Sequence, residues 1–212
     1  MEVTSEKGRV LGCLVEKQLT TPQQYPLTES ALMAACNQAT NRDPVVAYDV
    51  STVRITARSL REKGLLRMVH RTGERSDKHR HLLDSSLAVS QGQMTLLAVL
   101  LLRGPQTLGE LRLRSERMHA FDTVVEVQTE LDALTNRDNP LVARLERQPG
   151  RKEARYGQLL VKVEQDHPEP VPDETAQHPL TLVGLVREVE LLRGEVAELR
   201  AQIDRVGGTE GR

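Results

Sequence analysis

The sequence has very few aromatic residues. Its 212 residues include no tryptophan, and the only aromatic side chains are Tyr25, Tyr48, Phe121 and Tyr156. Pockets for flat cofactors and surfaces that stack single-stranded bases are rich in aromatic residues. The composition therefore argues against both classes of function.

Long hydrophobic runs and signal sequences are also absent. The longest apolar run, Met94–Leu102, has nine residues, whereas a membrane-spanning helix needs about 20. The start of the chain, Met1–Glu6, lacks the basic and apolar segments of a signal peptide. Cys13 and Cys36 lie in apolar helical stretches, which is typical of buried free thiols. These features predict a cytoplasmic protein that makes no contact with a membrane.

Net charge is close to zero, but the charges are unevenly distributed. Residues 1–90 carry 13 basic and 10 acidic side chains (+3), residues 91–163 carry 11 and 9 (+2), and residues 164–212 carry 5 and 11 (−6). The last part begins with an acidic stretch, 164–179, that contains four prolines. We expect this stretch to form an extended linker.

The first part has the pattern of three helices followed by a β-hairpin. Apolar residues recur at helical spacing from Val10 to Val15, and two further helices are expected to begin at Thr28 and Ser51. The third helix should end at Gly64. Two short apolar stretches, 65–69 and 81–83, predict the strands of the hairpin, joined by a polar turn.

The second part repeats this order. An apolar helix over 96–103 is followed by two helices that open with the spacing of a capping box, at Thr107 and Thr123, and by strands over 141–145 and 156–161. The apolar positions of the two third helices align in pairs: Val53 with Val127, Ala57 with Leu131, and Leu60 with Leu134.

Three helices followed by a hairpin is the order of elements in a winged-helix domain. We therefore predict a mainly α (α+β) protein with two tandem winged-helix domains, 1–90 and 91–163. The acidic linker, 164–179, would connect them to a coiled-coil helix over 180–206.

The coiled coil is predicted from apolar residues at alternating spacings of three and four. The residues expected to form the dimer contact are Leu182, Leu185, Val189, Leu192, Val196, Leu199 and Ile203. Mostly β-branched residues at one heptad position and leucine at the other favour a parallel two-stranded coil. We expect a homodimer through this helix; the alternative is a helix that packs back on its own domain.

Basic residues concentrate on two elements of the first domain. Arg54, Arg58 and Arg61 share one face of the third helix, which in a winged helix enters the major groove of DNA. The following hairpin would hold phosphates with Arg71, Arg75, Lys78 and Arg80. A solvated charged surface without a ligand is the alternative interpretation.

The second domain has a different charge pattern. Its third helix and cap contain Asp122, Glu126, Glu130 and Asp132 against Arg137 alone, and such a helix would be repelled by phosphates. Its hairpin is basic nonetheless, with Arg151, Lys152 and Arg155 as candidate phosphate contacts. If DNA is bound, we expect the first domain to insert its helix and the second to contribute its hairpin or a protein contact.

Signatures of enzymes are missing from the sequence. It has no phosphate-binding glycine loop, no nucleophile elbow and no zinc-type cluster of cysteine and histidine. His79 and His81 alternate in the first hairpin, but two ligands without a third make a weak metal site. We expect no catalytic residue, no metal and no cofactor.

Several longer motifs resemble the YceH family of bacterial proteins. These motifs are Glu16-Lys17-Gln18, Thr20-Thr21-Pro22, Ala35-Cys36-Asn37-Gln38, Leu101-Leu102-Arg103-Gly104 and Pro149-Gly150-Arg151-Lys152-Glu153. The resemblance covers most of residues 6–206 and implies tandem winged helices in a cytosolic protein. It implies no activity, and the family often has acidic or amide side chains where Arg54 and Arg58 stand here.

Together these patterns predict a dimeric winged-helix protein that binds double-stranded DNA and has a regulatory role. The alternative is a protein-interaction scaffold that uses its tandem winged helices without binding DNA directly.

Overall fold

A computed structural model describes residues 3–70, 76–146 and 153–161, which all belong to one compact unit, Met1–Val163. These residues form seven α-helices, one 3-10 turn and five short strands, which confirms the mainly helical α+β class. The elements are α1 Ser5–Thr20, η1 Pro22–Gln24, β1 Leu27–Thr28, α2 Glu29–Cys36, α3 Val50–Glu62, β2 Leu66–Val69, β3 Lys78–His81, α4 Leu83–Leu87, α5 Gln91–Arg103, α6 Leu108–Ser115, α7 Val124–Thr135, β4 Val142–Arg144 and β5 Tyr156–Gln158. The predicted linker, 164–179, and the helix over 180–206 with all its dimerisation residues lie outside the described residues.

Capping residues set the ends of the helices in the first half. The Thr28 hydroxyl caps α2 by accepting a hydrogen bond from the backbone N–H of Ala31, and Leu27 and Leu32 on either side are buried in one core. Gly64, with φ of +70°, follows α3 in the left-handed conformation that favours glycine. These features agree with the sequence prediction.

The first hairpin differs in detail from the prediction. The second strand, β3, covers Lys78–His81 and not 81–83: it begins three residues earlier than expected, and Leu83 already belongs to the short helix α4. The polar residues of β3 form a strand because β3 lies between β1 and β2 in an antiparallel sheet of order β1-β3-β2. Its backbone is therefore hydrogen-bonded on both sides, while His79 and His81 turn towards the core.

The second half again places three helices, α5, α6 and α7, before two paired strands, β4 and β5. The predicted capping box at Thr107 is present in full with Glu110. At α7 the Thr123 hydroxyl caps the backbone N–H of Glu126, but the Glu126 carboxylate accepts from Asp122 instead. Helix α5 begins at Gln91, five residues earlier than expected, because Ser90 forms a capping box there.

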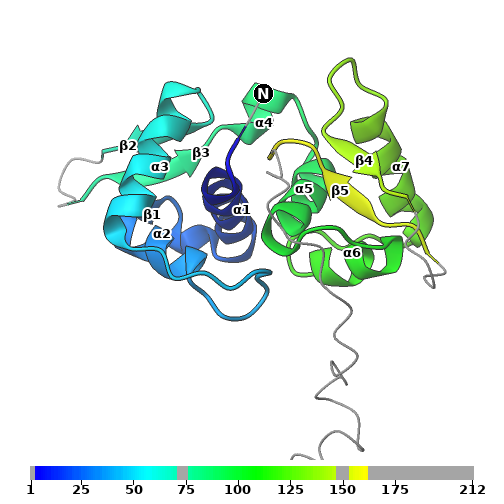
Figure 1. Ribbon diagram of the computed structural model, residues 1–212, viewed down its shortest axis with the longest axis horizontal. Helices are drawn as coiled ribbons and strands as arrows, with labels where there is room; N and C mark the ends of the chain where they lie inside the picture. The colour runs from blue at the N-terminus through cyan, green and yellow to red at the C-terminus, as the bar shows by residue number, and fades with distance from the viewer. Residues whose placement is uncertain (1–2, 71–75, 147–152, 162–212) are drawn as a thin grey trace, which may run out of the picture. The chain divides into compact units, whose positions relative to one another are not determined.

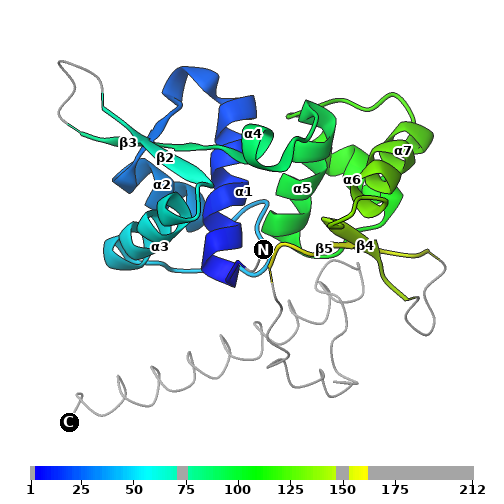
Figure 2. The same cartoon turned by 90° about the horizontal axis from the view of Figure 1, so that it is seen from above.

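Helices α1 and α5 lie side by side at the centre of the compact unit (Figures 1 and 2). A Cβ atom at Gly8 would come within 2.6 Å of Val161 Cγ2, and one at Gly12 within 2.8 Å of Leu102 Cγ. These two glycines therefore allow the close approach of α1 to α5 and to Val161, which follows β5.

Helix α5 supplies side chains to two hydrophobic cores. Met94, Ala98 and Leu102, four residues apart, belong to the core of the first half. Other residues of α5, Leu96 and Val99 among them, belong to the core of the second half. This dual role explains why the longest apolar run of the sequence falls on α5. None of the helices in the described part of the chain is both long and apolar enough to cross a membrane.

A buried ion pair attaches the loop between α2 and α3 to α1. The side chain of Arg42 is fully buried, and its two terminal nitrogens lie 3.1 and 2.6 Å from the carboxylate oxygens of Glu16. Burial alone would raise the pKa of Glu16, but the hydrogen bonds and charges of Arg42 and Lys17 together outweigh burial, so the pKa is lowered. Arg42 also donates to the backbone carbonyl of Ala35 at 3.1 and 3.2 Å, which fixes the end of α2.

His81 should make folding sensitive to mild acid. Burial lowers the pKa of its imidazole to about 4, and its Nδ1 accepts a hydrogen bond from the backbone N–H of Leu83. In the unfolded chain the pKa of this histidine is about 6.5. Between pH 6.5 and 4 the imidazole is therefore mostly protonated in the unfolded chain and mostly neutral in the folded chain. Stability present above pH 6.5 is therefore lost as the pH falls, by about 2 kcal/mol between pH 7 and 5.

Urea unfolding at pH 7, 6 and 5 measures this effect. In His81→Asn the side-chain oxygen can still accept from Leu83, but it does not titrate, so this part of the pH dependence should disappear. Burial also lowers the pKa of His79, but that contribution is common to both proteins. An equal slope in the two proteins would contradict the assignment to His81.

Candidate nucleic-acid interface

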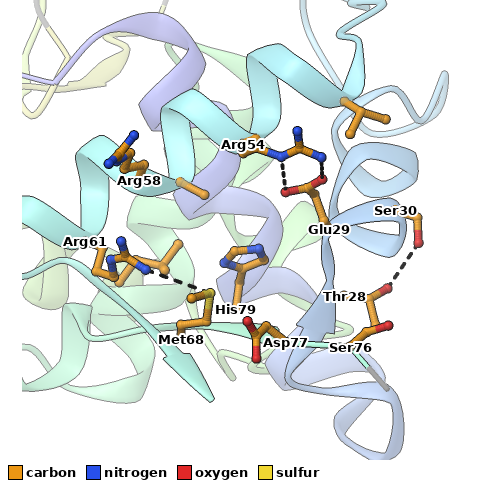
Figure 3. A pocket seen from close by; sticks show the side chains of 13 residues that line it. Thr28, Glu29, Ser30, Arg54, Arg58, Arg61, Met68, Ser76, Asp77 and His79 are labelled. Atoms are coloured by element: carbon orange, nitrogen blue, oxygen red, sulfur yellow. Dashed lines mark hydrogen bonds and ion pairs between the residues drawn. The ribbon is translucent and has the colours of Figure 1, made fainter. Parts of the chain in front are cut away.

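A groove of about 560 Å³ lies between α3, the β2–β3 hairpin and the beginning of α2, and we call it the arginine groove. It contains all three arginines singled out on the third helix (Figure 3). Its lining residues are Thr28, Glu29, Ser30, Val50, Arg54, Ala57, Arg58, Arg61, Leu66, Met68, Ser76, Asp77 and His79. Helical spacing thus brings Arg54, Arg58 and Arg61 to one face, as predicted.

Arg54 is paired with an acid inside the groove. Its Nε and Nη2 lie 3.1 and 2.8 Å from the two carboxylate oxygens of Glu29, the first residue of α2. The hydrogen bonds from Arg54 lower the pKa of Glu29 and, in return, raise the pKa of Arg54. The arginine side chain is 66% exposed, so a phosphate could replace Glu29 at little cost in stability, because exposed ion pairs contribute only about 0–1 kcal/mol.

The other two arginines make weaker contacts. Arg58 lies 3.7 Å from Glu62 one turn along α3, and the two side chains are 73% and 66% exposed. The Nη1 of Arg61 lies 3.8 Å from the sulfur of Met68, a weak acceptor. Both guanidinium groups therefore keep most of their donors for a ligand.

The basic residues of the first hairpin are placed differently. Lys78 and Arg80 alternate with His79 and His81 along β3, so they lie on the opposite face of the sheet from His79, which lines the groove. The other two candidates in this hairpin, Arg71 and Arg75, lie outside the described residues. The structure therefore brings Arg54, Arg58 and Arg61 together, and it does not bring Lys78 and Arg80 to the same groove.

The second half has a groove at the equivalent position, of about 390 Å³. Each groove lies beside the beginning of the second helix, which Thr28 or Thr107 caps. Each is also lined by the first and fifth residues of the third helix and by a pair of facing strand residues. The equivalent pairs are Val50 and Val124, Arg54 and Gln128, Met68 and Arg144, and His79 and Tyr156.

The first groove is lined by three basic and two acidic side chains, the second by one of each (Arg144 and Glu153). Gln128, in place of Arg54, accepts a hydrogen bond from the Tyr156 hydroxyl at 2.8 Å. Asp132 occupies the position of Arg58, as both are the ninth residue of their helix. The predicted difference in charge between the two third helices is thus found at equivalent helix positions, of which Gln128 lines the second groove and Asp132 does not.

The candidate phosphate contacts of the second hairpin are only partly described. Arg151 and Lys152 lie outside the described residues. Arg155 is engaged within the protein: it donates to the carbonyl of Pro105 at 3.0 Å and lies 3.5 Å from Glu110. Arg155, which directly precedes β5, thus connects the second hairpin to the beginning of α6.

Comparison with known proteins identifies the family of the chain. A family model described as "Protein of unknown function, DUF480" matches residues 3–151. The chain belongs to the DUF480 family. The resemblance noted in the sequence over most of residues 6–206 is consistent with this membership.

Similarity to individual DUF480 relatives extends over most of the chain. A UPF0502 protein of Shewanella halifaxensis is 40% identical over 209 residues, which are 96% of this chain and 97% of the relative. A UPF0502 protein of Koribacter versatilis is 44% identical over 194 residues, or 92% and 88% of the two chains. One of Geobacter sulfurreducens is 51% identical over 152 residues, or 72% and 69%.

In this DUF480 protein, Glu29 is a charged groove residue that sequence analysis did not single out. An acid in the first turn of a helix is ordinarily explained by the helix dipole, and its pairing with Arg54 of a different helix appears only in three dimensions. Two histidines considered for metal binding, His79 and His81, are buried. No group of three or more potential metal ligands occurs in the described part of the chain.

Proposed function

We propose that this chain is a tandem winged-helix protein that binds double-stranded DNA through its first half. The observation that carries the proposal is the arginine groove, in which Arg54, Arg58 and Arg61 stand on one exposed face of α3 beside a β-hairpin. In winged helices the third helix enters the major groove and the hairpin contacts adjacent phosphates. Arginine suits both tasks because its planar group pairs with phosphate or guanine through two hydrogen bonds.

The two halves contribute unequally in this proposal. Gln128 and Asp132 stand where Arg54 and Arg58 stand in the first half, so α7 would meet phosphates with an acid rather than a base. The second half then contacts DNA through its hairpin, where Arg151 and Lys152 are the candidates, or contacts another protein.

The proposal includes a homodimer formed through the helix over 180–206. Its support is the heptad pattern of the sequence, and a dimer suits an operator with two-fold symmetry. Changing Leu192 and Leu199 to aspartate should give monomers by light scattering, and an unchanged dimer mass would count against this part.

Salt dependence of binding tests the proposal. The full-length protein is titrated into random and genomic duplex pools at several salt concentrations. Five or more phosphate contacts should give a log–log slope of affinity against salt of about −4 or steeper. Absence of binding at low salt would contradict the proposal.

A protein-interaction scaffold is the second candidate, and the surface of α6 and α7 favours it. Leu113, Val124 and Val125 are 72%, 40% and 73% exposed there, and Asp122 and Glu126 are exposed beside them. Exposed apolar side chains grouped in this way are typical of a surface that meets a partner protein, and the acids of α7 favour a basic one, while Arg112 is exposed beside Leu113. This candidate is preferred if the protein fails to bind duplexes at low salt.

A further inference from the structure

A second pocket, of about 250 Å³, contains three arginines that the proposed DNA contacts do not use. Arg103 comes from the end of α5, and Arg114 and Arg117 come from the end of α6 and just beyond it. The opposite wall is formed by α1 and by the loop that carries Asn41. We call this the junction pocket, because elements of both halves of the compact unit line it.

The positive charge of the junction pocket is only partly neutralised. Arg103 donates to the neutral side-chain amide oxygen of Asn41, and Arg117 has no ion pair or hydrogen bond with any side chain among the described residues. Arg114 lies 3.6 Å from Glu110, a carboxylate that Arg155 shares at 3.5 Å. The pKa of Arg103 is lowered by burial and by the positive charges of Arg114 and Arg42.

Two acids also line the pocket, and they do not cancel this charge. Both carboxylate oxygens of Glu16 are occupied by Arg42, so Glu16 and Arg42 together add little net charge. Glu116 is exposed at the rim and opposes one of the three arginines. The pocket therefore has an excess of positive charge that favours an anion.

The remainder of the lining is apolar. Val99 and Leu102 are buried side chains of α5, Met118 is half-buried, and Leu113 is largely exposed. The pocket volume of about 250 Å³ leaves room for a small ligand. A bare phosphate would leave the apolar wall uncovered, whereas a short aliphatic acid would cover it.

We infer that the junction pocket binds a small carboxylate with a short apolar chain. The carboxylate pairs with Arg103, Arg114 and Arg117, and the chain lies against Val99, Leu102 and Met118. Hexanoate, which joins a carboxylate to a short apolar chain, is a simple probe of this chemistry. The inference does not depend on the proposed DNA binding.

Calorimetric titration of the full-length protein with three probes tests the inference. Hexanoate should bind in the millimolar range, because so small a ligand has few contacts to offer. Hexanamide has the same shape without the charge, and acetate has the charge without the chain. Each should bind at least roughly 10-fold more weakly than hexanoate. Equal binding of hexanamide, or of acetate, would overturn the inference.

Single substitutions show whether hexanoate binds in the junction pocket or in the arginine groove. Arg117→Gln should weaken hexanoate binding at least about fivefold without affecting folding, since Arg117 is exposed and pairs with no side chain in the described structure. Glu116→Gln should strengthen binding about twofold by removing the opposing charge. Arg58→Gln in the arginine groove is the matched control and should leave hexanoate binding unchanged. Loss of binding in Arg58→Gln but not in Arg117→Gln would place the anion in the arginine groove and refute the junction pocket.

Discussion

DNA affinity of the variant Arg54→Glu/Arg58→Glu is expected to be lower than that of the natural protein by roughly 100-fold or more at low salt. The two substitutions replace two exposed positive charges in the arginine groove with two negative ones, which phosphates repel. The side chains of Arg54 and Arg58 are 66% and 73% exposed, so folding should be unaffected. Fluorescence anisotropy with a labelled duplex measures the change.

Equivalent positions in the second half provide a matched control. Gln128 occupies in α7 the position of Arg54 in α3, and Gln128→Glu keeps an oxygen that can accept from the Tyr156 hydroxyl. This variant should bind DNA with the same affinity as the natural protein, because in the proposal only α3, and not α7, enters the major groove of the DNA. If Gln128→Glu loses as much DNA affinity as Arg54→Glu/Arg58→Glu, then α3 is not the specific contact. Both helices would contact DNA, or binding would depend only on the overall charge of the protein.

Within the same experiment, Glu29→Gln should raise the affinity for DNA. The substitution removes a negative charge beside the expected phosphate path and releases Arg54 from its partner, so a gain of about three- to tenfold is expected. A weaker complex would instead mean that Glu29 holds Arg54 in its binding position.

The largest expected loss of stability follows from removing the buried cation, in the variant Arg42→Met. The side chain of Arg42 is fully buried, and Glu16 is only 8% exposed. Without Arg42, the Glu16 carboxylate keeps only Lys17, 3.3 Å away, and the carbonyl of Ala35 keeps only the Cys13 thiol as a donor, at 3.3 Å. Unfolding free energy should fall by about 3–5 kcal/mol, as measured by urea unfolding at pH 7.

Two further variants distinguish a lost ion pair from a lost side chain. Glu16→Met/Arg42→Met should be more stable than Arg42→Met alone, because the unpaired charge is gone, although the carbonyl of Ala35 still lacks the two hydrogen bonds from Arg42. Arg58→Met breaks an exposed pair and should cost no more than about 0.5 kcal/mol. If Arg42→Met costs as little as Arg58→Met, the buried pair does not stabilise the loop.

Short-range patterns predicted the helices well. Capping threonines at Thr28, Thr107 and Thr123 mark helix starts because their hydroxyl oxygens accept from a nearby backbone N–H, which is a local event. The paired stripes Val53 with Val127 and Leu60 with Leu134 are buried as expected, because apolar residues at helical spacing face a core. The charge difference between α3 and α7 could also be read directly from their residues.

Features that depend on distant partners were not predicted. The strand Lys78–His81 is polar and has no alternating apolar pattern, and it exists because β1 and β2 both pair with it. The ion pair between Glu29 and Arg54 and the junction pocket around Arg103 join segments far apart in the sequence. One available signal was overlooked: an apolar run without a polar face, Met94–Leu102, indicates a helix covered on two sides.

The close packing of α1 on α5 also bears on how such a chain can change in evolution. When two domains are joined only by a flexible linker, either domain can be lost or transferred to another protein without unfolding the other. Here Gly8 and Gly12 admit no larger side chain without a shift of their neighbours. The backbone N–H of Val3 donates a hydrogen bond to the carbonyl of Leu160. Helix α5 also supplies side chains to both cores. The two halves therefore depend on each other for their packing, whereas substitutions on the exposed faces of α3 and α7, such as at Arg54 or Val125, disturb neither core.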